Sequence, residues 1–268
     1  MLASLALISL LQAPTIGADG LSLANPRFTH GVLGPVRADS KVRPGDSLVL
    51  SFDLQGISTD DAGKAAYTTA VEVTDAKGKA IYSQPARKIQ EFLPLGGGSL
   101  PAFAQIDLSP DSPAGEYSLK VTATDSTGAK SAATTQKFEV LPKAFDLVHL
   151  TVTGDADGLI PAGAFCVGQP FWFHASVVGF DRSTEGTSQP KVSLSLRVLD
   201  ENGKPIVAKP FVGSVDKEVP SKAIVLPVRF FVPLNKAGKY TVEITAQDDL
   251  KKGNAATKQY PLTVLPLK

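Results

Sequence analysis

The stretch PAGEYSLKVTATD, from Pro113 to Asp125, returns 123 residues later as KAGKYTVEITAQD, from Lys236 to Asp248. In both stretches apolar and polar residues alternate after the tyrosine. This is the period of a β-strand with one face buried and the other exposed. Because both the residues and the pattern recur, the chain contains an internal duplication.

Three further pairs of segments support the duplication, and they occur in the same order at offsets of 123 to 125 residues. They are VEVTDAKGK (71–79) with LRVLDENGK (196–204), KFEVLP (137–142) with PLTVLP (261–266), and RPGDSLVLSFDLQGI (43–57) with CVGQPFWFHASVVGF (166–180). Four collinear matches place essentially all of the chain after residue 20 in one of two copies.

Each copy has the pattern of an all-β domain. Short alternating runs are separated by turn sequences such as Asp75–Gly78 and Asp200–Gly203, in which glycine supplies a positive φ. No helical periodicity is present. The sequence predicts an all-β fold of two tandem antiparallel β-sandwich domains with about seven strands each, at residues 19–142 and 143–268.

The Ala-Gly-x-Tyr sequence before each long alternating run resembles the tyrosine corner of immunoglobulin-like and fibronectin type III-like sandwiches. Together with RPGD before the second strand and the V-x-D-x-x-G-K hairpin, the pattern is similar to tandem bacterial Ig-like, macroglobulin-like modules. The resemblance implies that Tyr117 and Tyr240 are structural residues. Their hydroxyl groups should hydrogen-bond nearby backbone.

The N-terminus indicates an exported protein. Residues 1–18 contain an apolar run from Leu2 to Leu11 and end in Ile16-Gly17-Ala18, which are small or apolar as in a signal peptide. The run is too short to span a membrane. No later segment is apolar over a membrane-spanning length, so we expect no membrane span in the mature chain. The expected location is the periplasm, the cell surface or the medium.

The charge balance and the missing motifs exclude several function classes. There are 27 Lys and Arg against 26 Asp and Glu, so no basic field recruits nucleic acid. None of the histidines, at positions 30, 149 and 174, belongs to a catalytic motif, and Cys166 has no second cysteine. We expect neither an enzyme nor a bound cofactor.

The nearest approach to a metal motif is TGDADG, in which Asp155 and Asp157 alternate before a glycine. A twelve-residue calcium loop that began at Asp155 would need its last carboxylate at position 166, which is a cysteine. An ordinary Asp/Gly turn explains the same letters. We therefore expect no metal at these two residues.

The strand QPFWFHASVVGF (169–180) contains the chain's only tryptophan. Alignment with the first copy places Trp172 and His174 on the outer face of the sheet. The same alignment, with Phe231 set against Leu108, places Val228 and Phe230 beside them on the neighbouring strand. The four side chains would then form an exposed aromatic patch, which is typical of a binding surface. Cover by another part of the chain, or a one-residue slip of the second strand, would remove this patch.

These observations predict a non-catalytic, exported binding or scaffold protein. Its partner would be a protein or a polymer of the cell surface or extracellular medium. One alternative is a carbohydrate-binding accessory module that uses the aromatic face around Trp172. Another is a periplasmic chaperone-like protein with two Ig-like domains.

Overall fold

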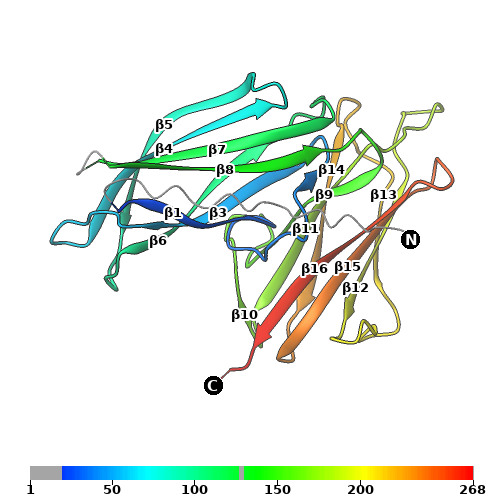
Figure 1. Ribbon diagram of the computed structural model, residues 1–268. Coiled ribbons are helices and arrows are strands. Elements are labelled where there is room, and N and C mark those ends of the chain that lie inside the picture. The colour runs from blue at the N-terminus through cyan, green and yellow to red at the C-terminus, as the bar shows by residue number, and fades with distance from the viewer. Residues whose placement is uncertain (1–19, 127–129, 268) are drawn as a thin grey trace, which may run out of the picture. The chain divides into compact units, whose positions relative to one another are not determined.

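The computed structural model describes residues 20–126 and 130–267 (Figure 1). The predicted signal peptide lies outside the described residues. The described residues form sixteen strands in four sheets, and each sheet takes its strands from one side of the linker at residues 141–145. The prediction of an all-β fold is confirmed. The domain boundaries stay predictions, because grouping by backbone proximity divides the chain at other points.

The first copy contributes a three-stranded sheet, β1-β3-β6, and a five-stranded sheet, β2-β8-β7-β4-β5. Its strands are β1 (Ser22–Thr29), β2 (Lys41–Val42), β3 (Ser47–Gln55), β4 (Lys64–Asp75), β5 (Ala80–Phe92), β6 (Ser99–Asp107), β7 (Gly115–Asp125) and β8 (Ser131–Val140).

The second copy repeats this topology, with sheets β14-β11-β9 and β10-β16-β15-β12-β13. Its strands are β9 (Asp146–Thr153), β10 (Phe165–Cys166), β11 (Pro170–Val178), β12 (Val192–Leu199), β13 (Phe211–Val215), β14 (Val225–Pro233), β15 (Gly238–Asp248) and β16 (Ala255–Leu265). Each copy has eight described strands, one more than expected. The extra strands are the two-residue β2 and β10, which pair in parallel with β8 and β16.

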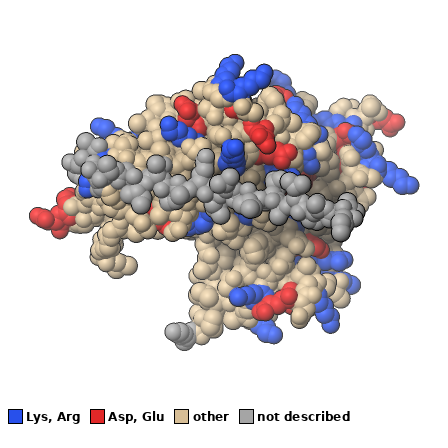
Figure 2. Space-filling model, viewed as in Figure 1, with Lys and Arg blue, Asp and Glu red and all other residues tan. Residues whose placement is uncertain are grey.

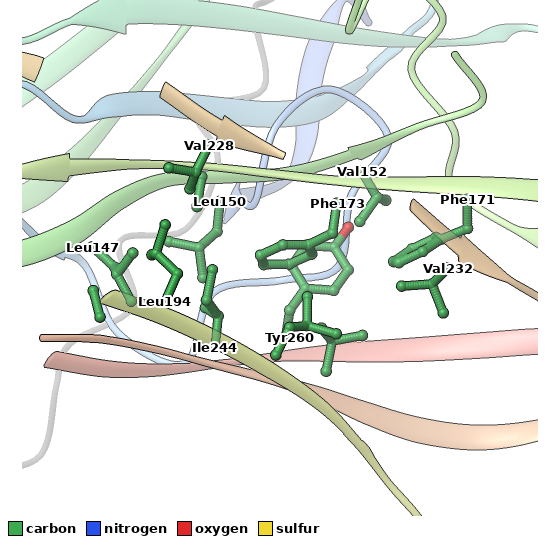
Figure 3. Close-up of a cluster of buried hydrophobic side chains, with 14 of the residues drawn as sticks. Leu147, Leu150, Val152, Phe171, Phe173, Leu194, Val228, Val232, Ile244 and Tyr260 are labelled. Carbon is green, nitrogen blue, oxygen red and sulfur yellow. The ribbon is translucent and has the colours of Figure 1, made fainter. Parts of the chain in front are cut away.

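The alternation that predicted the strands also places the core. In β15, Val242, Ile244 and Ala246 are fully buried while Glu243 and Thr245 between them are not. The two sheets of the second copy enclose one hydrophobic cluster, drawn in Figure 3. At its centre the Phe173 ring meets the Tyr260 ring edge-on, with centroids 5.8 Å apart.

Equivalent backbone features recur in both copies, which confirms the duplication at the level of structure. Asn25 in β1 and His149 in β9 both have positive φ, of 51° and 59°. At His149, β9 carries an extra residue opposite β11, which is a β-bulge. Buried carboxylates recur as well. Asp125 Oδ2 accepts the N–H of Ser58 at 2.9 Å, and Asp248 Oδ2 accepts the N–H of Asp181 at 2.9 Å.

Because the Asp248 carboxylate is buried and satisfies two backbone donors, its removal should destabilise the second copy. Its other oxygen accepts the N–H of Leu250 at 3.0 Å. In Asp248→Ala both donors lose their partner, and we expect the free energy of unfolding to fall by about 2 kcal/mol. Urea denaturation measures this change. The matched control is Asp249→Ala, which removes an adjacent exposed carboxylate and should change stability by less than about 0.5 kcal/mol. Equal losses in the two variants would show that Asp248 does not hold these backbone groups.

Candidate functional site

The candidate site is on the outer face of the sheet β14-β11-β9. In the antiparallel register of β11 and β14, Pro170 lies opposite Pro233 and Trp172 lies opposite Phe231. All four side chains belong to the outward set, because their neighbours Phe171 and Val232 are buried in the core. We call these four residues, Pro170, Trp172, Phe231 and Pro233, the ring plate. It consists of two adjacent cross-strand pairs of rigid rings.

The tryptophan of the ring plate is partly covered by its own module. Its ring centroid lies 5.1 Å from that of Phe231 at an interplanar angle of 49°. The guanidinium carbon of Arg229 lies 5.8 Å from the Trp172 ring centroid, within the range of a cation–π interaction. Phe231 itself remains 47% exposed. The plate is therefore held in place by ring and cation contacts while part of its apolar surface faces solvent.

The structure corrects the predicted position of Val228 and Phe230. Val228 is 9% exposed and lies in the core cluster (Figure 3), and Phe230 packs against the same cluster. The outward residues of β14 that lie opposite Trp172 and His174 are instead Phe231 and Arg229. Of the four residues predicted to form the patch, the structure brings Trp172 and His174 together on the outer face and turns the other two inward.

The cause is the register of this strand. The N–H of Gly45 donates to Leu108 O at 3.2 Å, and the equivalent N–H of Gly168 donates to Leu234 O at 2.7 Å. Leu108 therefore corresponds to Leu234, an offset of 126 residues, and not to Phe231 as the sequence alignment assumed. The difference of three residues is odd, so it exchanges the inner and outer faces of the strand.

The first copy shows that the ring plate is not required by the fold. With the corrected register, the four equivalent positions are Ser47, Val49, Gln105 and Asp107. Ser47 Oγ lies 2.5 Å and Gln105 Nε2 2.9 Å from Asp107 Oδ1. Although burial opposes it, these hydrogen bonds hold the pKa of Asp107 below its usual value. The same backbone frame thus carries a largely polar surface in the first copy and four rings in the second.

His174 belongs to a hydrogen-bond network that both copies share. Thr153 Oγ1 lies 2.7 Å from Asp155 O and 2.8 Å from His174 Nε2. Because a carbonyl oxygen only accepts, the Thr153 hydroxyl donates to Asp155 O and His174 Nε2–H donates to Thr153. Burial lowers the pKa of His174, in keeping with a neutral ring.

The first copy builds this network with a different residue. Thr29 Oγ1 donates to Gly31 O at 2.9 Å and lies 2.9 Å from Ser51 Oγ. A serine therefore takes the place of His174 without loss of the network. This equivalence indicates that the imidazole of His174 has a structural role.

The loop after β9 uses its two aspartates for its own structure. The Asp155 carboxylate accepts the N–H groups of Ile160 at 2.7 Å, Leu159 at 3.1 Å and Asp157 at 3.2 Å. The hydrogen bond from Ile160 is the main cause of the lowered pKa of Asp155. The part of the chain that the structure describes contains no group of three or more His, Cys, Asp or Glu side chains placed to hold a metal ion.

Arg229 ties this loop to the sheet. Its Nη1 donates to Ala156 O at 2.7 Å and lies 3.5 Å from Asp157 Oδ1. Since the same guanidinium contacts the Trp172 ring, one side chain fixes both the loop and the plate. Sequence reasoning missed Arg229 and Phe231, because only the pairing register shows that they flank Trp172 and His174.

The structure also places the two tyrosines at the start of β7 and β15. The Tyr240 hydroxyl lies 3.1 Å from Lys236 O and 3.3 Å from Ala237 O, so it donates to the backbone that precedes its strand. The Tyr117 ring is buried and stacks on Phe138, with centroids 5.5 Å apart. Both tyrosines lie within the first three residues of a central strand of the five-stranded sheet.

Positive and negative side chains are interspersed on the face drawn in Figure 2, as the near-zero net charge of +1 predicts. The described residues include no helix long and apolar enough to cross a membrane. From its sheet topology and its site, the protein belongs to the class of tandem Ig-like β-sandwich proteins, with the ring plate on one outer face of the second copy.

Comparisons with solved structures find proteins of similar fold at low sequence identity. No protein-family model and no curated protein matches the sequence. A C-terminal domain of the Streptococcus agalactiae AgI/II polypeptide BspA is similar over 89% of this chain and 99% of its own, with 10% identity and a TM-score of 0.31. A superoxide reductase from Ignicoccus hospitalis is similar over 43% of this chain and 80% of its own, with 18% identity and a TM-score of 0.28. Red sea bream transglutaminase is similar over 84% of this chain and 30% of its own, with 11% identity and a TM-score of 0.27.

Proposed function

We propose that this chain is an exported, non-catalytic binding protein whose second Ig-like module holds its partner on the ring plate. The observation that carries the proposal is the contrast between the two copies. One sheet frame has Ser47, Gln105 and Asp107 at positions where the other has Pro170, Phe231 and Pro233. The outer face of an antiparallel sheet is normally polar, so an apolar plate on that face needs another explanation, and binding supplies one.

The ring plate suits binding because its parts are already ordered. Proline and aromatic rings have few rotatable bonds, so they lose little conformational entropy when a partner arrives. Arg229 and Phe231 both contact the Trp172 ring. On a preorganised surface of this kind, a smaller part of the interaction free energy is offset by the ordering of side chains.

The polar groups around the plate support a role without catalysis. His174 Nε2 donates to Thr153, the Asp155 carboxylate accepts three backbone N–H groups, and Arg229 binds the Ala156 carbonyl. These groups maintain the loop and the sheet. A general base needs a lone pair directed at a substrate. The Asp155 carboxylate oxygens already accept three backbone N–H groups of their own loop.

The tryptophan makes the proposal testable directly. Trp172 is the only tryptophan of the chain, so its fluorescence reports on the ring plate alone. The probes are hydroxyethyl cellulose and galactomannan as neutral polysaccharides, heparin as a polyanion, unfolded casein as a protein and the chain itself over a concentration series. We expect at least one to change the Trp172 emission in a saturable way. Phe231→Ala should weaken that binding by at least about tenfold, because it removes an exposed contact of the plate.

The matched control is Phe103→Ala. Phe103 is 48% exposed on β6 of the first copy and lies outside the plate, so its loss should leave the titration unchanged. The proposal is wrong if none of the probes changes the emission, or if a probe binds Phe231→Ala as well as it binds the unaltered protein.

A further inference from the structure

We infer that the occupant of the ring plate is a neutral polysaccharide, with sugar rings lying flat on Trp172 and Phe231. This inference rests on the proposed binding role of the plate. The face of a sugar ring that carries axial C–H groups is apolar and matches the face of an aromatic ring, while the hydroxyl groups at its rim need polar partners. The plate offers both kinds of surface, because Arg229 and Asp157, which we call the polar row, border its rings.

The geometry of the plate fits a linear chain of rings. Neighbouring strands lie about 5 Å apart, and alternate residues of one strand lie about 7 Å apart. The two pairs, Pro170 with Pro233 and Trp172 with Phe231, therefore present four rings within a small area of the sheet. The Trp172 and Phe231 rings are inclined at 49° to each other, so each can contact a different sugar ring. A polymer of rings can extend along such an array and make the same contact more than once.

The polar row beside the plate favours an uncharged ligand. Arg229 and Asp157 have exposed side chains and form an ion pair with Nη1 to Oδ1 at 3.5 Å. Since the two charges oppose each other, the row does not select an anion or a cation. A guanidinium has five N–H donors, and the contact with Ala156 O uses Nη1, so Arg229 keeps donors for ligand hydroxyl groups, and the Asp157 carboxylate is an acceptor.

Two features disfavour a protein partner. The plate is too small for a globular protein, and the edge of the sheet is unsuited to an added peptide strand. A stable interface between globular proteins takes about 20 to 30 residues and about 800 Å² from each side, far more than four rings supply. An extended peptide could instead add to β14, which is an edge strand. However, Pro227 and Pro233 lie within β14 and lack the N–H groups that strand addition needs.

Affinity electrophoresis in native gels tests the inference. The gels contain hydroxyethyl cellulose, galactomannan or xylan as neutral polymers, and heparin or alginate as charged ones. We expect retardation by at least one neutral polymer and a loss of about tenfold or more in affinity in Trp172→Ala and in Phe231→Ala. Phe103→Ala should migrate as the unaltered protein does. Retardation should persist when the salt is raised to about 0.5 M, because no net charge is involved. Urea denaturation of each variant confirms that it is folded.

The outcomes separate this inference from the proposed function. Saturable quenching of Trp172 by casein or heparin alone, lost in Phe231→Ala, would retain the plate as a binding site and overturn the polysaccharide. Retardation by a neutral polymer that survives both plate substitutions would also overturn it. If no probe acts on the tryptophan or on the mobility, both the inference and the proposed function are wrong.

Discussion

Gly56→Ala and Gly179→Ala should each lower the free energy of unfolding by about 3 kcal/mol or more. The two glycines are equivalent in the duplication and have φ values of 73° and 68°. An added Cβ would lie 2.2 Å from Gly20 O in the first copy and 2.3 Å from Ala144 O in the second. The left-handed backbone costs about 1–2 kcal/mol for a residue with a Cβ, and displacement of a packed backbone carbonyl adds about 1–3 kcal/mol.

Two other glycines separate these contributions. Gly78 and Gly203 have φ values of 77° and 76°, but a Cβ there would meet nothing within 4 Å. Gly78→Ala and Gly203→Ala should therefore cost only the backbone term, about 1–2 kcal/mol. Urea denaturation followed by circular dichroism measures all four variants, and Trp172 fluorescence follows the second copy in particular. Equal losses at the two pairs of sites would mean that the backbone at Gly56 and Gly179 is not packed as described.

The sequence was sufficient to predict the strands because each copy repeats the same alternation. An apolar residue at every second position of 117–123 and 240–246 allows only one face to be buried, so strand type and inward set follow together. Segments with weaker alternation could then be assigned as strands from their equivalents in the other copy. The expectation that Trp172 points away from the core was correct for the same reason, since its neighbours Phe171 and Phe173 fill the inward positions.

The alternation does not determine the register of β14. Its sequence, VLPVRFFVP, has apolar residues on both faces, so neither parity is favoured by burial. An insertion of three residues before this strand then shifts its alignment with the first copy. Only the backbone hydrogen bonds of Gly168 and Leu234 resolve the shift.

The ring plate could not be read from the sequence for a related reason. Pro170 and Pro233 are 63 residues apart, and a proline usually marks a turn or the edge of a strand. Their adjacency depends on the pairing of β11 with β14. The contribution of Arg229 likewise requires the loop after β9 to return over the sheet, which no local pattern predicts.

Three phenylalanine substitutions measure which rings of the second copy lie in the core. The comparison of Phe230 with Phe231 tests the corrected register, and Phe173 serves as the reference for a fully buried ring. Phe173 is fully buried, and its ring meets the Tyr260 ring edge-on. We expect Phe173→Ala to lower the free energy of unfolding by about 3–5 kcal/mol, because it removes a large core side chain and leaves a cavity. On the adjacent strand, Phe230 packs against the core cluster while Phe231 faces solvent.

Phe230→Ala should therefore cost about 2–3 kcal/mol, and Phe231→Ala less than about 1 kcal/mol. The two variants remove the same side chain from consecutive positions, so composition and strand propensity change equally. Only the face on which each ring lies differs between them. Urea denaturation of the two proteins decides the register: a larger loss in Phe231→Ala than in Phe230→Ala would return Phe230 to the outer face. In that case the plate would consist of Trp172 and Phe230, and the offset of 126 residues would be wrong.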